Sequence, residues 1–139
     1  MKKIQYLILS ALIIFMGGCA RTAELSKVLW GSSTKALEDA RVESVSRIYQ
    51  CGYDDCFNEV LKVAKEEKLE VFIKDKPRSR IVLMHVPKST NTTEVGVFFL
   101  GFGPQETKLE VASLSYSARD EAAKILFSKL GEAYPEKNK

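Results

Sequence analysis

The sequence predicts an α+β domain in which an antiparallel sheet of about five strands carries two main helices on one face. Three observations predict this fold. Residues 45–51 alternate as a half-buried strand does, four further segments between turn-forming residues have the character of strands, and two segments repeat apolar residues at helical spacing. Consecutive strands are joined by short connections, which favours antiparallel pairing. The predicted element order is β-α-β-β-β-β-α, in a single domain over residues 45–134.

The first strand and the first main helix meet at a cysteine-rich junction. Residues 45–51 alternate as a strand does, and Asp54 is a good N-cap for the helix that follows. The predicted buried face of this helix carries apolar residues at helical spacing. These residues are Phe57, Val60, Leu61 and Ala64.

Four further strands follow, separated by turn-forming residues. A Pro-containing turn at 75–79 makes a hairpin of the first two, and Gly101 to Pro104 turns the chain between the last two. The expected strands are residues 69–74, 80–86, 94–100 and 106–114.

The last main helix is predicted to begin at Ser117, with Asp120 three residues on completing a pair similar to a capping box. Gly131 is placed to stop it, and residues 135–139 are expected to be a disordered tail. Its predicted buried stripe consists of Ala118, Ala122, Ile125, Leu126 and Leu130.

The N-terminus has the features of an export signal. Lys2 and Lys3 precede an apolar stretch at residues 4–16, which is shorter than the roughly 20 apolar residues of a spanning helix. The segment Met16-Gly17-Gly18-Cys19 that follows resembles the lipobox of bacterial lipoproteins: an apolar residue, two small residues and a cysteine. An uncleaved anchor and an ordinary signal with a chance cysteine are the alternatives.

The lipobox resemblance implies that residues 1–18 are a cleaved signal peptide and that Cys19 carries acyl chains such as palmitate. Two or more chains hold a protein stably at a bilayer. Ala20 follows the cysteine, where an aspartate would resemble an inner-membrane retention signal. We therefore expect a cell-envelope protein, lipid-anchored to the outer membrane and facing the periplasm.

Residues 19–44 form the lipidated anchor and a short helical lead-in, which either docks on the domain or spaces it from the membrane. The formal charge is +3, and removal of Lys2 and Lys3 leaves 19 basic against 18 acidic side chains. This balance gives no electrostatic footprint for nucleic acid.

The element order and the hairpin "LEVFIKDKPRSRIVL" resemble the TBP-like or helix-grip topology. Domains of that sort occur in envelope lipoproteins such as the BamC component of outer-membrane assembly. The stretches "WGSSTKALEDAR" and "TTEVGVFF" are also similar to those of uncharacterised bacterial lipoproteins. The resemblance implies a fold and no activity.

Signatures of catalysis are few. The one histidine, His85, lies in an apolar strand, so a multi-histidine metal site is excluded, and no serine suggests a catalytic triad. Asp54 and Asp55 are interpreted as helix-capping residues, because adjacent carboxylates do not readily face one cleft. We expect no catalytic residue, no metal and no cofactor.

The segment "CGYDDC" holds Cys51 and Cys56. If Cys19 carries lipid, two thiols remain in a compartment that permits disulfides, so we predict that they are bonded. The ring would contribute roughly 2 kcal/mol by loop entropy. The alternatives are two reduced, buried cysteines, a metal site, and a redox pair, whose usual Cys-X-X-Cys spacing this segment lacks.

Two surface features are candidates for binding. In "VGVFFLGF", one face of the strand is assigned to the core, and the other holds Phe98, Leu100 and Phe102, which are partly exposed if helices cover one face only. Four basic residues lie in or beside the 75–79 turn of the hairpin. We interpret them as a solvated tip that resists edge pairing, and contact with anionic headgroups or an envelope polymer is the alternative. The four residues are Lys74, Lys76, Arg78 and Arg80.

We therefore expect a non-enzymatic, lipid-anchored envelope protein that binds or scaffolds a protein partner, with Phe98, Leu100 and Phe102 as the candidate partner face. The alternatives are a binding module for a small apolar ligand and a thiol oxidoreductase using Cys51 and Cys56.

Overall fold

Five antiparallel strands form one sheet, in the order β1-β5-β4-β3-β2. The computed structural model describes residues 33–137, and Ala36–Lys139 form one compact unit, separate from Met1–Lys35. The predicted fold class, α+β, and the predicted order of strands and main helices are confirmed. The elements are η1 Ala40–Glu43, β1 Val45–Tyr49, α3 Tyr53–Glu66, β2 Glu70–Asp75, β3 Arg80–Met84, β4 Val95–Gly103, β5 Glu106–Ala112 and α4 Tyr116–Ala133.

Several predictions concern residues outside the described range. The signal peptide at 1–18, the lipidation site Cys19, residues 20–32 of the lead-in and residues 138–139 of the tail all lie there. The rest of the lead-in is described: residues 33–39 are helical and continue into η1.

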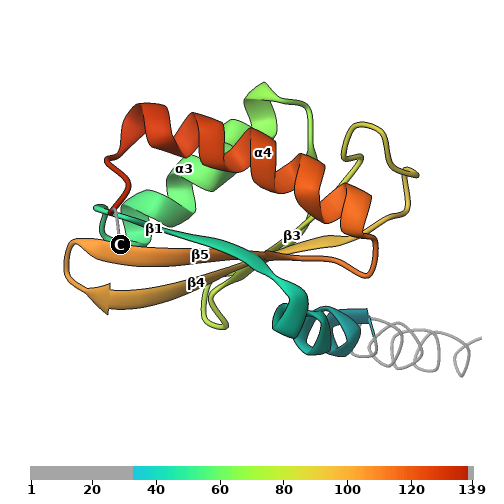
Figure 1. Cartoon of the computed structure of the whole chain (residues 1–139), viewed down its shortest axis with the longest axis horizontal. Coiled ribbons are helices and arrows are strands. Elements are labelled where there is room, and N and C mark those ends of the chain that lie inside the picture. The colour runs from blue at the N-terminus through green and yellow to red at the C-terminus, as the bar shows by residue number, and fades with distance from the viewer. Residues whose placement is uncertain (1–32, 138–139) are drawn as a thin grey trace, which may run out of the picture. The chain divides into compact units, whose positions relative to one another are not determined.

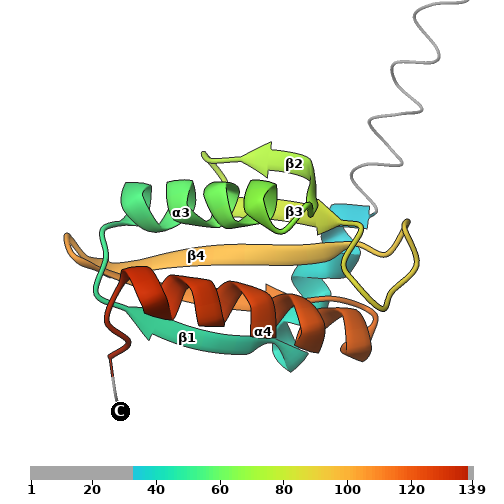
Figure 2. The ribbon, with the colours of Figure 1, turned by 90° about the horizontal axis from the view of Figure 1, so that it is seen from above.

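The two long helices α3 and α4 lie side by side over one face of the sheet (Figure 1, Figure 2). β1 lies at one edge of the sheet and β2 at the other, on either side of the central strands β5, β4 and β3 (Figure 2). The strands β1, β3, β4 and β5 send alternate side chains towards the helices, which is how an antiparallel sheet builds a core on one face. The largest fully buried side chains of this core are Tyr49, Phe57, Ile81, Leu83, Leu109, Leu126 and Leu130.

The helix α3 begins two residues earlier than predicted, with Gly52 rather than Asp54 at the N-cap. A Cβ on Gly52 would lie 3.0 Å from the carbonyl oxygen of Pro104, so the close approach of the β4–β5 turn favours glycine. Asp54 and Asp55 lie in the first turn, where negative charge interacts favourably with the helix dipole. Asp54 also pairs with Lys76, its Oδ1 2.7 Å from Nζ.

The helix α4 is longer than predicted at both ends. Ser115, not Ser117, is the N-cap, and its hydroxyl accepts a hydrogen bond from the amide of Ala118. The prediction that Gly131 stops the helix is wrong: the helix continues to Ala133. Gly131 does not adopt the left-handed conformation of a glycine C-cap, and the amide of Tyr134 closes the last turn on Leu130.

The described part of the predicted tail is ordered along the outer edge of β1. The amide of Gln50 donates to the carbonyl of Pro135 at 2.9 Å, and the amide of Lys137 donates to the carbonyl of Ile48 at 2.9 Å. Tyr49 and Glu136 form an antiparallel bridge. The composition of the tail predicted disorder because it could not show that an unpaired strand edge lies within reach.

Candidate interaction surface

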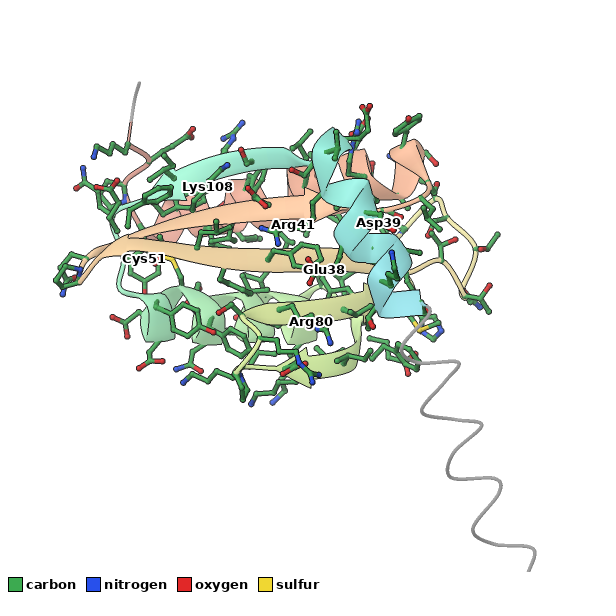
Figure 3. The ribbon with its side chains drawn as sticks, turned by 90° about the horizontal axis from the view of Figure 1, so that it is seen from below. Glu38, Asp39, Arg41, Cys51, Arg80 and Lys108 are labelled. Carbon is green, nitrogen blue, oxygen red and sulfur yellow. A yellow bond between two sulfur atoms is a disulfide. The ribbon has the colours of Figure 1, made fainter. Side chains whose placement is uncertain are left out.

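The sheet face opposite α3 and α4 is called the open face here. Alternation along β4 and β5 places Phe98, Leu100, Lys108 and Glu110 on it. The described part of the lead-in, residues 33–44, crosses one end of this face (Figure 3). There Leu37, 2% exposed, forms a second, smaller apolar cluster with Val82, Phe98 and Ala112.

Phe98 is the centre of this second cluster. Its ring lies so close to Gly96 that a Cβ there would be 2.7 Å from Cε2 and 2.9 Å from Cζ. The guanidinium carbon of Arg41 lies 4.6 Å from the ring centroid, in cation–π geometry. The ring of Phe98 therefore fills the space that a side chain at residue 96 would occupy, and Arg41 covers it from the lead-in.

Charged side chains form a connected network across the open face (Figure 3). Glu110 accepts hydrogen bonds from Lys108 at 2.8 Å and from Arg41 at 2.7 and 2.9 Å. Arg41 also donates to Glu38, 3.1 Å away. The other carboxylate oxygen of Glu38 is 3.6 Å from Arg80, which connects the network to β3.

The network fixes the charge of Glu110. Burial alone would raise the pKa of this carboxyl, but hydrogen bonds from Lys108 and Arg41 outweigh burial and hold the pKa below its usual value. Burial likewise opposes the charge of Arg41, and its two carboxylate partners raise its pKa above the ordinary value. At neutral pH the pair is thus fully ionised, and its side chains are mostly buried, 31% exposed for Arg41 and 11% for Glu110.

The basic hairpin between β2 and β3 is less free than the sequence suggested. Asp75 accepts from the amide and side chain of Arg78, both at 3.3 Å, and from Arg80 at 3.1 Å. These interactions hold the pKa of Asp75 below its usual value although burial opposes the shift. The Nε atom of Arg80 is buried and has no hydrogen-bond partner within the described part of the chain.

The structure separates the three residues of the predicted partner face. Phe98 is 2% exposed and lies under the lead-in, so it is not at the surface. Leu100 is half-buried, and Phe102 is 60% exposed. Phe102 also lies where the β4–β5 register shifts between Gly101 and Gly103, a bulge that simple alternation could not predict.

The end of the open face that the described lead-in does not cover has an apolar strip, defined here as Ile48 and Leu100 with the stem of Lys108, and the exposed Phe102 follows Leu100 at the bulge. Lys108 pairs in register with Ile48 on one side and with Leu100 on the other, so the three lie in a row across β1, β5 and β4. The ammonium of Lys108 is held by Glu110. Its methylene stem therefore lies between the two apolar side chains.

The cysteines Cys51 and Cys56 lie together where β1 leads into α3, with their sulfur atoms in bonding position and their Cα atoms 5.9 Å apart. Both belong to the core, at 2% and 0% exposure. The hydroxyl of Thr107 donates to the carbonyl of Cys51, and the amide of Cys56 donates to the carbonyl of Gly52. This arrangement is that of a bridge between the strand and the helix.

His85 follows β3 rather than lying inside a strand. Its φ of 57° ends the extended conformation, and β3 stops at Met84. Its Nδ1 is 3.3 Å from a carboxylate oxygen of Glu70, and both side chains are about half exposed. In residues 33–137 no group of three or more His, Cys, Asp and Glu side chains is arranged to hold a metal ion.

The interactions of Arg41 and Glu110 were missed by sequence reasoning. Glu38 and Arg41 are three residues apart in a helical segment, which is a signal for an ion pair on one helix face. Glu110 is a charge within the otherwise apolar end of β5, and such a charge needs a partner when buried. Neither signal shows that Arg41 contacts Glu110, because the two residues are 69 positions apart in the chain.

A scan against models of protein families finds no match, and a search of curated proteins finds no relative. In the part of the chain that the structure describes, no helix has both the length and the apolar character needed to cross a membrane.

Proposed function

We propose that this chain is a lipid-anchored protein of the cell envelope, tethered through Cys19 to the outer membrane and facing the periplasm, and that it binds a protein partner without catalysing a reaction. The observation that supports partner binding is the apolar strip with its half-buried Leu100, followed at the bulge by Phe102, which is 60% exposed. Aromatic side chains surrounded by partly exposed apolar residues are typical centres of protein interfaces.

The lead-in supports this placement of the binding surface. Its described residues, 33–44, cover the end of the open face that holds Phe98 and lie away from the end that holds Lys108, the register partner of Leu100 (Figure 3). Arg41 of the lead-in donates two hydrogen bonds to Glu110 of the sheet and one to Glu38, which also pairs with Arg80 of the sheet. These interactions fix the boundary between the covered and uncovered ends. A preformed surface of this kind binds without a large ordering cost.

A binding module for a small ligand is the alternative. A cleft of about 510 Å³ lies between β1 and α4, within the size range of ligand pockets. Its lining includes Arg47, Asp120 and Lys124 beside Phe127, so it suits a partly polar occupant better than an apolar one. Thiol exchange has less support, because both Cys51 and Cys56 are buried and a substrate disulfide could not reach them.

Photo-crosslinking in intact cells tests the partner surface. A photoreactive amino acid at residue 102 should capture a partner that the same group at residue 114 does not, although Leu114 is the more exposed of the two, at 76% against 60%. Leu114 follows β5 at the end remote from the β4–β5 turn, which makes it a matched control. The partner reading is refuted if residues 102 and 114 give the same products.

Anchoring is tested separately. Metabolic labelling with an alkyne-bearing palmitate analogue should label the chain, and Cys19→Ser should abolish labelling and release the protein from the membrane fraction. Labelling that survives in Cys19→Ser would contradict the lipobox assignment and leave the crosslinking result unaffected.

A further inference from the structure

The outer edge of β1 is only partly paired. The tail, Pro135–Lys137, bonds to the carbonyl of Ile48 and to the amide of Gln50. Strand alternation then directs both backbone groups of Ser46, and the amide of Ile48, to the same outer side. None of these three groups has a hydrogen-bond partner among residues 33–137 on that side.

The cleft described above opens directly beside these groups. It is lined from β1 by Val45, Ser46 and Arg47, and from α4 by residues that include Ala123 and Phe127. In Figure 2, β1 and α4 run next to each other at this edge of the sheet. An extended segment that continued the pairing begun by the tail would therefore place alternate side chains in the cleft.

The tail itself is held weakly. Its residues are exposed, and besides two backbone hydrogen bonds it makes two ion pairs at the surface, Glu136 with Arg47 at 3.0 Å and Lys137 with Glu106 at 2.7 Å. Exposed ion pairs of this kind contribute little to stability. A competing strand can thus displace the tail without disrupting the core.

We propose that the β1 edge binds an extended, acidic segment of a partner protein, which adds to the sheet as a strand antiparallel to β1 and takes the place of the tail. Main-chain hydrogen bonds to Ser46, Ile48 and Gln50 hold the segment, and its side chains opposite Val45 and Arg47 enter the cleft. This mode of recognition is strand addition. It uses the backbone edge of β1 and the cleft on the helix side of the sheet, whereas the apolar strip uses the side chain of Ile48 on the opposite face, so the two proposals are independent.

The charges around the cleft define the chemistry of the segment. The guanidinium of Arg47 lies 5.1 Å from the ring centroid of Phe127, which directs it across the cleft towards α4. Lys124 also lines the cleft, whereas the carboxylate of Asp120 is paired with Arg119 at 2.7 Å. Two cations and one neutralised carboxylate favour an acidic side chain, as Glu136 of the tail already shows.

Selection from a phage-displayed library of random dodecapeptides, with the full chain in detergent as bait, tests the proposal. The selected peptides should share an acidic residue flanked at alternate positions by apolar ones. Binding of a labelled selected peptide is then measured by fluorescence anisotropy. Glu136→Lys, which sets a cation against Arg47 and loosens the tail, should tighten binding severalfold. Glu132→Lys, an exposed charge reversal at the end of α4, should not.

Ser46→Pro removes one outward-facing amide from an edge strand, where proline is tolerated. It should weaken peptide binding on the order of tenfold, whereas Ser46→Ala, which keeps the amide, should bind as the parent chain does. Amide hydrogen exchange of the unsubstituted chain gives an independent measure. Bound peptide should slow exchange at Ser46 and Ile48 and leave Arg47, which faces β5, unchanged.

Equal affinity of all four variants, or unchanged exchange at Ser46 and Ile48, would overturn the proposal. Failure to select any peptide above background would do the same. Dimerisation of the Glu136→Lys chain without peptide binding would assign the edge to a second copy of this chain and also refute it. A negative result here leaves the crosslinking test at residue 102 unaffected.

Discussion

Gly96→Ala is expected to destabilise the domain because the ring of Phe98 occupies the place of the missing side chain. The new Cβ would lie 2.7 and 2.9 Å from two ring carbons, whereas carbon atoms pack best at about 3.5–4.0 Å. The ring cannot move freely, since Phe98 is 2% exposed and Arg41 lies over it. Overpacking of this kind costs about 2 kcal/mol.

The double variant Gly96→Ala/Phe98→Leu tests whether the ring of Phe98 causes the loss of stability. Phe98→Leu removes the ring at a cost of about 1 kcal/mol, and in that background Gly96→Ala should cost close to nothing. The double variant is thus expected to lose about 2 kcal/mol less stability than the sum of the two single losses, an interaction energy that contacting residues commonly show. Gly101→Ala is the control on the same strand, because no atom lies within 4 Å of its added Cβ.

Urea unfolding followed by circular dichroism measures the free energy of unfolding of all four variants, and thermal unfolding gives their melting temperatures. In a domain of this size, a loss of about 2 kcal/mol lowers the melting temperature by roughly 8–16 °C. Two results would refute the close packing of Phe98 on Gly96 in the second cluster. One is that Gly96→Ala proves as stable as Gly101→Ala, and the other is that the effects of Gly96→Ala and Phe98→Leu simply add.

Two further predictions concern the cysteines and the charge network. Thiol labelling of the purified, unreduced protein should modify neither Cys51 nor Cys56 even after unfolding, and modification of both would disprove the bridge. Glu110→Gln should lower stability at pH 7 by about 2 kcal/mol, because it removes a carboxylate that accepts from Arg41 and Lys108. The pKa of Glu110 is lower in the folded state, so its contribution is complete above its unfolded value, 4.5, and is lost as the pH falls through the folded pKa. Denaturant unfolding at several pH values should therefore show the difference between parent and variant shrinking below about pH 4.5, and a constant difference would contradict the assignment.

Local patterns predicted most of the scaffold because each depends on residues close in the sequence. Alternation identified β1, apolar segments between turn-forming residues identified the other four strands, and helical spacing identified α3 and α4 with much of their buried faces. The errors lie at element ends. Gly52 rather than Asp54 caps α3, and Gly131 fails to stop α4, because backbone approach and core packing outweigh the preference of a single residue there.

The candidate surface was only partly predictable. Alternation correctly separated Phe98 and Leu100 from the core-facing side of β4, but it could not show that Leu37 of the lead-in covers Phe98. Nor could composition show that Pro135–Lys137 pair with the edge of β1. Both contacts join segments distant in the chain, and neither has a local signature.

The sequence by itself determined the fold class, the order of the elements and the basis for expecting a lipid anchor at Cys19, because hydrophobic periodicity and short motifs are properties of neighbouring residues. The tertiary structure decided which surfaces are exposed. In the folded chain Phe98 is buried, Phe102 lies at a bulge, and Arg41 bonds to Glu110, 69 residues away. Part of the outer edge of β1 is unpaired among the described residues and lies beside a cleft. Exposure depends on which distant segments pack together, and only the folded chain brings them into contact.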